Sequence, residues 1–147
     1  MKFNKLIIEN YKSFQFPTVI NFPQSNDGKR IFLIGGMNGA GKTSVMEAIN
    51  ISLYGGRPEN IYKAINRKEL SNGNAFVSFE VELETDEFET ILINRSWSAG
   101  ATDTPKFKDL EEKLVIVKDG KRVSVQNKDM WQDFINATIP KSITQFF

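Results

Sequence analysis

Residues 36–43 are Gly36-Met-Asn-Gly-Ala-Gly-Lys-Thr43, which matches the phosphate-binding pattern G-x-x-x-x-G-K-[ST]. The glycines of such a loop let backbone N–H groups turn inward around phosphate oxygens. Lys42 would place its charge on the β- and γ-phosphates, and the Thr43 hydroxyl would bind Mg²⁺. A glycine-rich turn that binds nothing would disfavour Lys42, because the helix dipole repels a cation at a helix start. The segment therefore predicts a nucleotide site for ATP and Mg²⁺.

The flanking segments fit this prediction. Residues 31–34 are a short apolar run, which predicts a strand buried on both faces. After the loop, side chains on one helical face recur at Val45, Ala48, Ile49, Ser52 and Leu53. Gly55-Gly56 predicts the end of that helix. A buried strand, a glycine-rich loop and a helix, in this order, form the arrangement that a phosphate-binding loop requires.

The rest of the chain predicts mostly β structure, and the expected fold class is α/β with a mixed sheet and antiparallel hairpins. Besides residues 31–34, strands are expected at residues 3–9, 18–22, 75–83, 90–97, 114–118 and 121–125. Asp119-Gly120 predicts a two-residue hairpin turn. A last helix should end at Pro140, with one face formed by Trp131, Phe134, Ile135 and Thr138.

Composition limits the chemistry of the chain. Its 147 residues predict one domain, or one lobe of a larger one. It has no cysteine and no histidine, which excludes disulfides, thiolate nucleophiles, Cys/His zinc sites and histidine acid–base chemistry. Its net charge of +1 gives no overall attraction to nucleic acid. Without an apolar signal core or a membrane-spanning run, a cytoplasmic location with no membrane contact is expected.

Longer stretches resemble the heads of ABC-type ATPases. Residues 36–49 are similar to the G-x-N-G-x-G-K-[ST] loop and helix of these heads. Residues 6–14, Leu-Ile-Ile-Glu-Asn-Tyr-Lys-Ser-Phe, resemble the first strand and the N-[FY]-[KR]-S-F turn of the SMC, RecF and SbcC branch. Residues 139–147, Ile-Pro-Lys-Ser-Ile-Thr-Gln-Phe-Phe, resemble DndD, the ATPase of DNA phosphorothioation systems. A DndD-like ATPase is the leading prediction, and an SbcC-type repair ATPase is the alternative within the class.

The resemblance implies that residues 1–147 are the single N-terminal lobe of a split ATPase head, a fragment of a longer protein. In this branch the C-terminal lobe supplies the signature motif, the Walker B Asp-Glu and the switch histidine. The chain has no S-G-G motif, no apolar strand ending in Asp-Glu and no histidine, and Gln145 precedes the expected Q-loop position. We therefore assign no catalytic residue, and expect weak ATP binding without hydrolysis. The implied partners are the C-terminal lobe, a second head in a homodimer, other DNA-modification proteins, and DNA in the full complex.

The motif and the resemblance together assign the site residues. The expected nucleotide ligands are Gly36, Asn38, Gly39, Ala40, Gly41, Lys42, Thr43, Ser44, Lys12 and Ser13, and Thr43 is also the expected Mg²⁺ ligand. Lys12 would reach toward the phosphates, or be a solvated lysine in a hairpin loop. Asn38 would bond near the γ-phosphate, or only tolerate a left-handed backbone.

Several hypotheses stay open. Tyr62 could stack on adenine or serve packing. DNA could bind over a basic cluster, Lys63, Arg67 and Lys68, and over a strand face that carries Arg95 and Trp97. A solvated protein face is the simpler explanation for these residues. The acidic residues 82–89 are most simply a charged hairpin tip. Two functions of other classes are a small P-loop kinase, which the antiparallel hairpins after the loop disfavour, and a non-catalytic interaction module.

Overall fold

The computed structural model describes residues 1–23, 33–100, 102, 104–123 and 128–139. The strands are β1 Lys2–Glu9, β2 Thr18–Asn21, β3 Phe76–Glu84, β4 Thr90–Ala99, β5 Leu110–Lys118 and β6 Lys121–Arg122. The helices are α1 Lys42–Tyr54, α2 Pro58–Ala64, α3 Arg67–Ser71 and α4 Lys128–Thr138, with a 3₁₀ turn at Phe107–Asp109. The predictions for Pro140, Gln145 and the other DndD-like residues after Ile139 lie outside the described residues.

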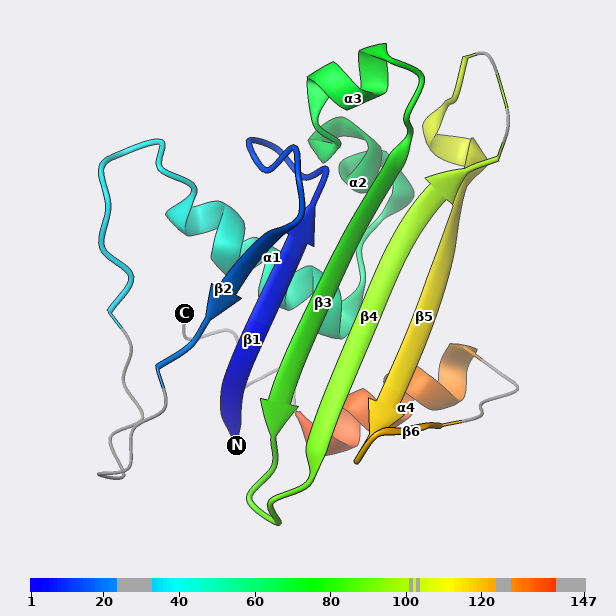
Figure 1. Ribbon diagram of the computed structural model, residues 1–147. Coiled ribbons are helices and arrows are strands. Elements are labelled where there is room, and N and C mark those ends of the chain that lie inside the picture. The colour runs from blue at the N-terminus through cyan, green and yellow to red at the C-terminus, as the bar shows by residue number, and fades with distance from the viewer. Residues whose placement is uncertain (24–32, 101, 103, 124–127, 140–147) are drawn as a thin grey trace.

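The six described strands form one sheet in the order β2-β1-β3-β4-β5-β6 (Figure 1). Each neighbouring pair is antiparallel, so the described strands supply only the antiparallel part of the predicted mixed sheet. Alternation fixes which side of the sheet is buried, since β3 turns Val77, Phe79, Val81 and Leu83 inward, all fully buried. The α/β class and the antiparallel hairpins are thus confirmed.

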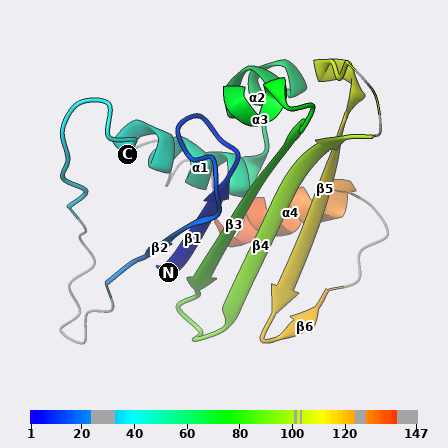
Figure 2. The same ribbon diagram turned by 45° about the horizontal axis from the view of Figure 1, so that its top comes forward.

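Helices α1 and α4 lie against the same face of this sheet, as both ribbon views show (Figures 1 and 2). The predicted helical face is confirmed, because α1 buries Val45, Ala48, Ile49, Ser52 and Leu53. On α4, Ile135 is buried, while the Trp131 side chain lies outside the described atoms. The outer face is polar in part, with Lys5 lying 3.7 Å from both Glu80 and Glu82. The core therefore lies between the inner sheet face and the helices.

The predicted turn at Asp119-Gly120 is confirmed. Its φ angles are 48° and 75°, the left-handed values that a two-residue hairpin turn requires at both positions. The strand predicted after it is shorter than expected, since β6 covers only Lys121–Arg122, and residues 124–125 lie outside the described ranges. The two-residue turn therefore joins β5 to a short edge strand.

The strand predicted before the glycine-rich loop is wrong in its described half. Leu33 and Ile34 belong to no strand, and Leu33 is 96% exposed. The backbone polar groups of a strand need hydrogen-bond partners from a neighbouring strand. None of the described strands pairs with residues 33–34, so apolar character alone does not make this segment β structure.

Candidate nucleotide-binding site

The glycine-rich loop meets the N-terminal end of α1. Gly39 and Gly41 have φ angles of 85° and 92°, which side chains with a Cβ adopt only with strain. The Ala40 N–H donates to the Met37 carbonyl at 3.1 Å and closes a tight turn. The Val45 N–H donates to the carbonyl of Gly41, the N-cap residue of α1, at 3.0 Å. The loop thus stands at a helix N-terminus, where free N–H groups and the dipole attract anions.

The Lys42 ammonium lies over its own loop. It donates a hydrogen bond to the Gly36 carbonyl and another to the Met37 carbonyl, at 3.0 Å for the second. These carbonyls balance a cation that the α1 dipole would otherwise repel. Charged phosphate oxygens accept stronger hydrogen bonds than carbonyls do. A phosphate entering the loop would therefore draw Lys42 away from Gly36 and Met37.

The described site residues differ in their access to solvent. Gly36, Asn38, Gly39 and Ala40 are exposed, so the loop is open to a ligand. Thr43 is exposed and can present its hydroxyl to an ion, whereas Ser44 is 8% exposed. This contrast fits a metal-binding role for Thr43 and a backbone role for Ser44.

The turn between β1 and β2 contacts this loop. A Cβ built on Gly41 would lie 3.2 Å from the Phe14 ring and 3.9 Å from the Ser13 hydroxyl. Backbone bonds hold the turn, since the Lys12 N–H donates to the Ala64 carbonyl at 2.7 Å. The Asn66 side-chain amide donates to the Lys12 carbonyl at 2.8 Å. The structure therefore brings Ser13 close to the loop, and its contact with a nucleotide stays a prediction.

The Lys12 side chain, by contrast, pairs with a residue that sequence reasoning missed. Its ammonium forms a salt bridge with Glu47 of α1, and the Tyr11 hydroxyl donates to the same carboxylate at 3.0 Å. Burial, followed by the hydrogen bond to Glu47, raises the pKa of Tyr11, so the phenol stays a donor. One feature of the sequence could have pointed to Glu47 as a partner for a nearby cation, because it is the single carboxylate in residues 42–54.

Arg95 and Trp97 do not form the DNA surface that the sequence suggested. Their exposed fractions are 3% and 1%, since strand alternation places them on the inner face beside Ile91 and Ile93. This part of the DNA hypothesis is wrong. The other basic residues of that hypothesis are exposed, and DNA contact by them stays a prediction: Lys63, Arg67 and Lys68.

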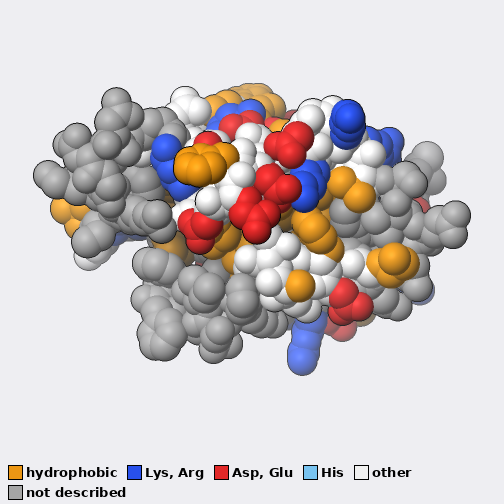
Figure 3. Space-filling model, turned by 90° about the horizontal axis from the view of Figure 1, so that it is seen from below, with side chains coloured by type: hydrophobic (Ala, Val, Ile, Leu, Met, Phe, Trp, Pro, Cys, Tyr) orange, Lys and Arg blue, Asp and Glu red, His pale blue; other side chains and the backbone are white. Residues whose placement is uncertain are grey.

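Tyr62 and the acidic residues have structural contacts. The Tyr62 hydroxyl donates to the Pro105 carbonyl at 2.7 Å, and its ring packs against the core. This favours the packing role over adenine stacking. The acidic side chains gather at the β3–β4 end of the molecule (Figure 3), and Asp86 and Glu87 at the loop are exposed. No group of three His, Cys, Asp or Glu among the described residues could hold a metal ion.

Replacing Gly41 with alanine should destabilise the chain by about 1–2 kcal/mol, because a φ of 92° strains a residue with a Cβ. The new methyl group would also press on the Phe14 ring. Gly73→Ala is the matched control, since Gly73 has a φ of 81° with no atom within 4 Å of a built Cβ. Urea unfolding should show the larger loss for Gly41→Ala. Equal losses would show that the ring yields without cost.

The glycine-rich loop leads directly into a helix that packs on a sheet, and a lysine occupies the first helical position. These features define a P-loop nucleotide-binding domain. The chain belongs to the AAA domain family, whose model matches residues 5–146. It is similar to the SbcC component of the nuclease SbcCD from Clostridium acetobutylicum, with 31% identity over 97 residues, or 66% of this chain. The aligned part is 8% of the length of that relative.

These findings support the predicted SMC/SbcC-type relationship. Separately, none of the described helices is both long and apolar enough to cross a membrane.

Proposed function

We propose that this chain is the N-terminal ATP-binding lobe of a longer SbcC-like, SMC-type ATPase that processes DNA. The observation that carries the proposal is the loop at the start of α1, with Lys42 over it and the β1–β2 turn in contact with Gly41. Family membership over residues 5–146 and similarity to a component of a nuclease support it.

The proposed ligand is ATP with Mg²⁺. Its phosphates would lie against the backbone N–H groups of residues 38–44, with Lys42 on the β- and γ-phosphates. The Thr43 hydroxyl would be the chain's ligand to Mg²⁺, which prefers oxygen donors and usually keeps several waters and phosphate oxygens. The exposure of the loop and of Thr43 fits this donor set. Asn38, exposed in the turn after Met37, would bond near the γ-phosphate.

The DndD-like assignment is a narrower form of the same proposal. It depends on residues 139–147, of which 140–147 lie outside the described residues. The similarity to SbcC supports the SbcC-type alternative. The residues that follow Phe147 in the natural gene distinguish the two, because a DndD-like head would continue into an F-D-G-E segment. In both cases the proposed partners are the C-terminal lobe, a second head and DNA, and in the DndD case also other DNA-modification proteins.

An ATPase assay with two protein components tests the proposal. The chain alone should bind MgATP without turnover, because neither a Walker B Asp-Glu nor a switch histidine occurs in its sequence. Adding the C-terminal lobe encoded by the same gene should restore phosphate release. Phosphoryl transfer to an added acceptor would indicate a kinase. No binding with or without the lobe would indicate an interaction module.

Replacing Glu47 with glutamine should raise the affinity for MgATP by about two- to fivefold, the range expected for release of an exposed salt bridge. The change frees the Lys12 ammonium from Glu47 for the phosphates. Lys12→Met should lower the affinity, as measured by calorimetric titration. In a Lys12→Met background the Glu47→Gln change should have no effect. An equal gain in both backgrounds would show that Lys12 does not contact the nucleotide.

A further inference from the structure

The C-terminal end of α1 is held by a buried arginine of the sheet. Arg95 of β4 donates from Nε to the Ser52 carbonyl at 3.1 Å and from Nη2 to the Leu53 carbonyl at 3.2 Å. The last carbonyls of a helix have no partners within the helix, and its C-terminus attracts a cation. Glu112 of β5 pairs with Nη1 of the same guanidinium. Arg95 and Glu112 therefore fix α1 to the sheet.

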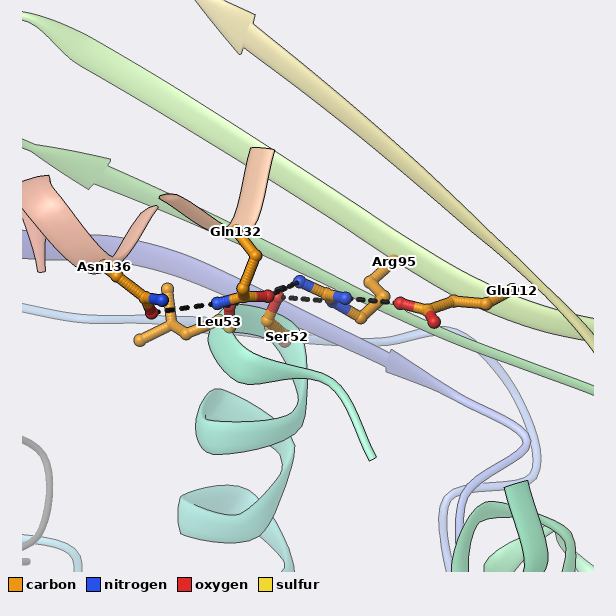
Figure 4. A network of polar contacts seen from close by, with 6 residues as sticks. All are labelled: Ser52, Leu53, Arg95, Glu112, Gln132 and Asn136. Atoms are coloured by element: carbon orange, nitrogen blue, oxygen red, sulfur yellow. Dashed lines mark hydrogen bonds and ion pairs between the residues drawn. The ribbon is translucent and has the colours of Figure 1, made fainter. Parts of the chain in front are cut away.

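Helix α4 joins this junction through Gln132 (Figure 4). The Gln132 side-chain oxygen accepts from Arg95 at 3.1 Å, and its amide donates to the Leu53 carbonyl at 3.2 Å. A second link comes from the Tyr54 hydroxyl, which donates to the Ile139 carbonyl at 2.9 Å just after α4. These contacts tie α4 to α1.

The junction and the phosphate-binding loop lie at opposite ends of one rigid element. Helix α1 has 13 residues, which corresponds to about 20 Å at 1.5 Å per residue. Its core-facing side is buried, and packed helices transmit displacements because protein interiors are hardly compressible. At the loop end, Lys42 has two alternative partners, the carbonyls that it now contacts and an entering phosphate.

A pocket lies beside this junction. Its volume is about 520 Å³, and Arg95, Glu112 and Gln132 are among its lining residues. Small movements of Gln132 at this pocket need not displace core side chains. The Gln132 side chain therefore has open space on one side and its contacts with Arg95 and Leu53 on the other.

We propose that Arg95 and Gln132 are positioning residues that couple the docking of α4 on α1 to nucleotide occupancy of the phosphate-binding loop. This inference rests on the proposed ATP-binding function. Bound MgATP restricts the remaining motion of α1, so that the Ser52 and Leu53 carbonyls stay in place for Arg95 and Gln132. By linkage, a docked α4 favours MgATP by the same factor by which MgATP favours docking.

Amide hydrogen exchange of the whole 147-residue chain, with and without saturating MgATP, tests the coupling. In the wild type, MgATP should slow the exchange of residues 128–139 about fivefold, at the low end of known couplings. Gln132→Met should remove this slowing and weaken MgATP binding by a similar factor. Asp133→Asn, an exposed neighbour on α4, should behave as the wild type. Tyr54→Phe serves as a second variant if Gln132→Met does not fold.

The outcomes separate this inference from the proposed function. If the wild type binds MgATP but residues 128–139 exchange unchanged, the coupling is refuted and the ATP-binding proposal stands. The coupling is also refuted if MgATP slows the exchange of residues 128–139 equally in the wild type and in Gln132→Met. The same holds for Tyr54→Phe if that variant is used instead. If the wild type does not bind MgATP, the proposed function fails, and the coupling fails with it.

Discussion

Replacement of Lys42 by alanine is expected to weaken MgATP binding by about 100-fold or more, because hydrogen bonds to charged groups contribute about 1.5–3 kcal/mol each. The fold should tolerate the change. Among the described residues, the Lys42 ammonium donates hydrogen bonds to the carbonyls of Gly36 and Met37, in an exposed loop. Alanine is the better helix former and removes a cation from the helix start. Titration calorimetry and thermal unfolding should therefore show lost affinity with unchanged or higher stability.

Lys63→Ala is the matched control for this prediction. Lys63 is an exposed lysine in the last turn of α2, so its removal changes the net charge equally without touching the loop. Its affinity for MgATP should equal that of the wild type. An equal loss in both variants would indicate a general electrostatic effect. An identical response of wild type and Lys42→Ala to MgATP, even with the C-terminal lobe supplied, would contradict the ATPase proposal.

The parts of the fold that the sequence predicts are those set by local spacing. The alternation of Val77, Phe79 and Val81 specifies a buried strand face, and the helical spacing after residue 44 specifies the buried face of α1. The positive φ angles of the loop glycines follow in the same way, since the motif itself requires them. Each of these features depends on neighbours along the chain.

The features that the sequence does not predict depend on distant partners. Glu47 meets Lys12 across 35 residues of sequence, and Arg95 meets the Ser52 carbonyl across 43. Strict alternation does place Arg95 on the buried face of the strand. Its charge nevertheless favours a position on the protein surface, because the sequence does not show which buried groups would pair with the guanidinium. The strand prediction for residues 33–34 fails for a related reason, since apolar character does not show whether a neighbouring strand is present to pair with them. The local sequence pattern therefore identifies the phosphate-binding loop, whereas the contacts around the loop can be identified only from the three-dimensional structure.

Replacement of Arg95 by methionine is expected to lower the free energy of unfolding by about 3–5 kcal/mol, because the Ser52 and Leu53 carbonyls each lose a hydrogen bond from a charged group and such bonds contribute about 1.5–3 kcal/mol each. Burial lowers the pKa of Arg95, and Glu112 acts in the opposite direction. Methionine fills much of the volume but donates no hydrogen bond to the carbonyls of Ser52 and Leu53. In a protein of this size the change corresponds to a melting temperature about 6–20 °C lower. Urea unfolding with an unchanged m-value would measure it.

Arg122→Met controls for the loss of a cation, because Arg122 is exposed on the edge strand β6 and should cost no more than about 0.5 kcal/mol. The double variant Arg95→Met with Glu112→Gln then locates the cause. Recovery of most of the lost stability would assign the loss to the Glu112 carboxylate, which no longer has its ion pair with Arg95. A double variant as unstable as Arg95→Met would assign it to the helix carbonyls, which is the outcome expected, because Glu112 keeps 23% of its side chain in solvent. Wild-type stability in Arg95→Met would refute a structural role for this arginine.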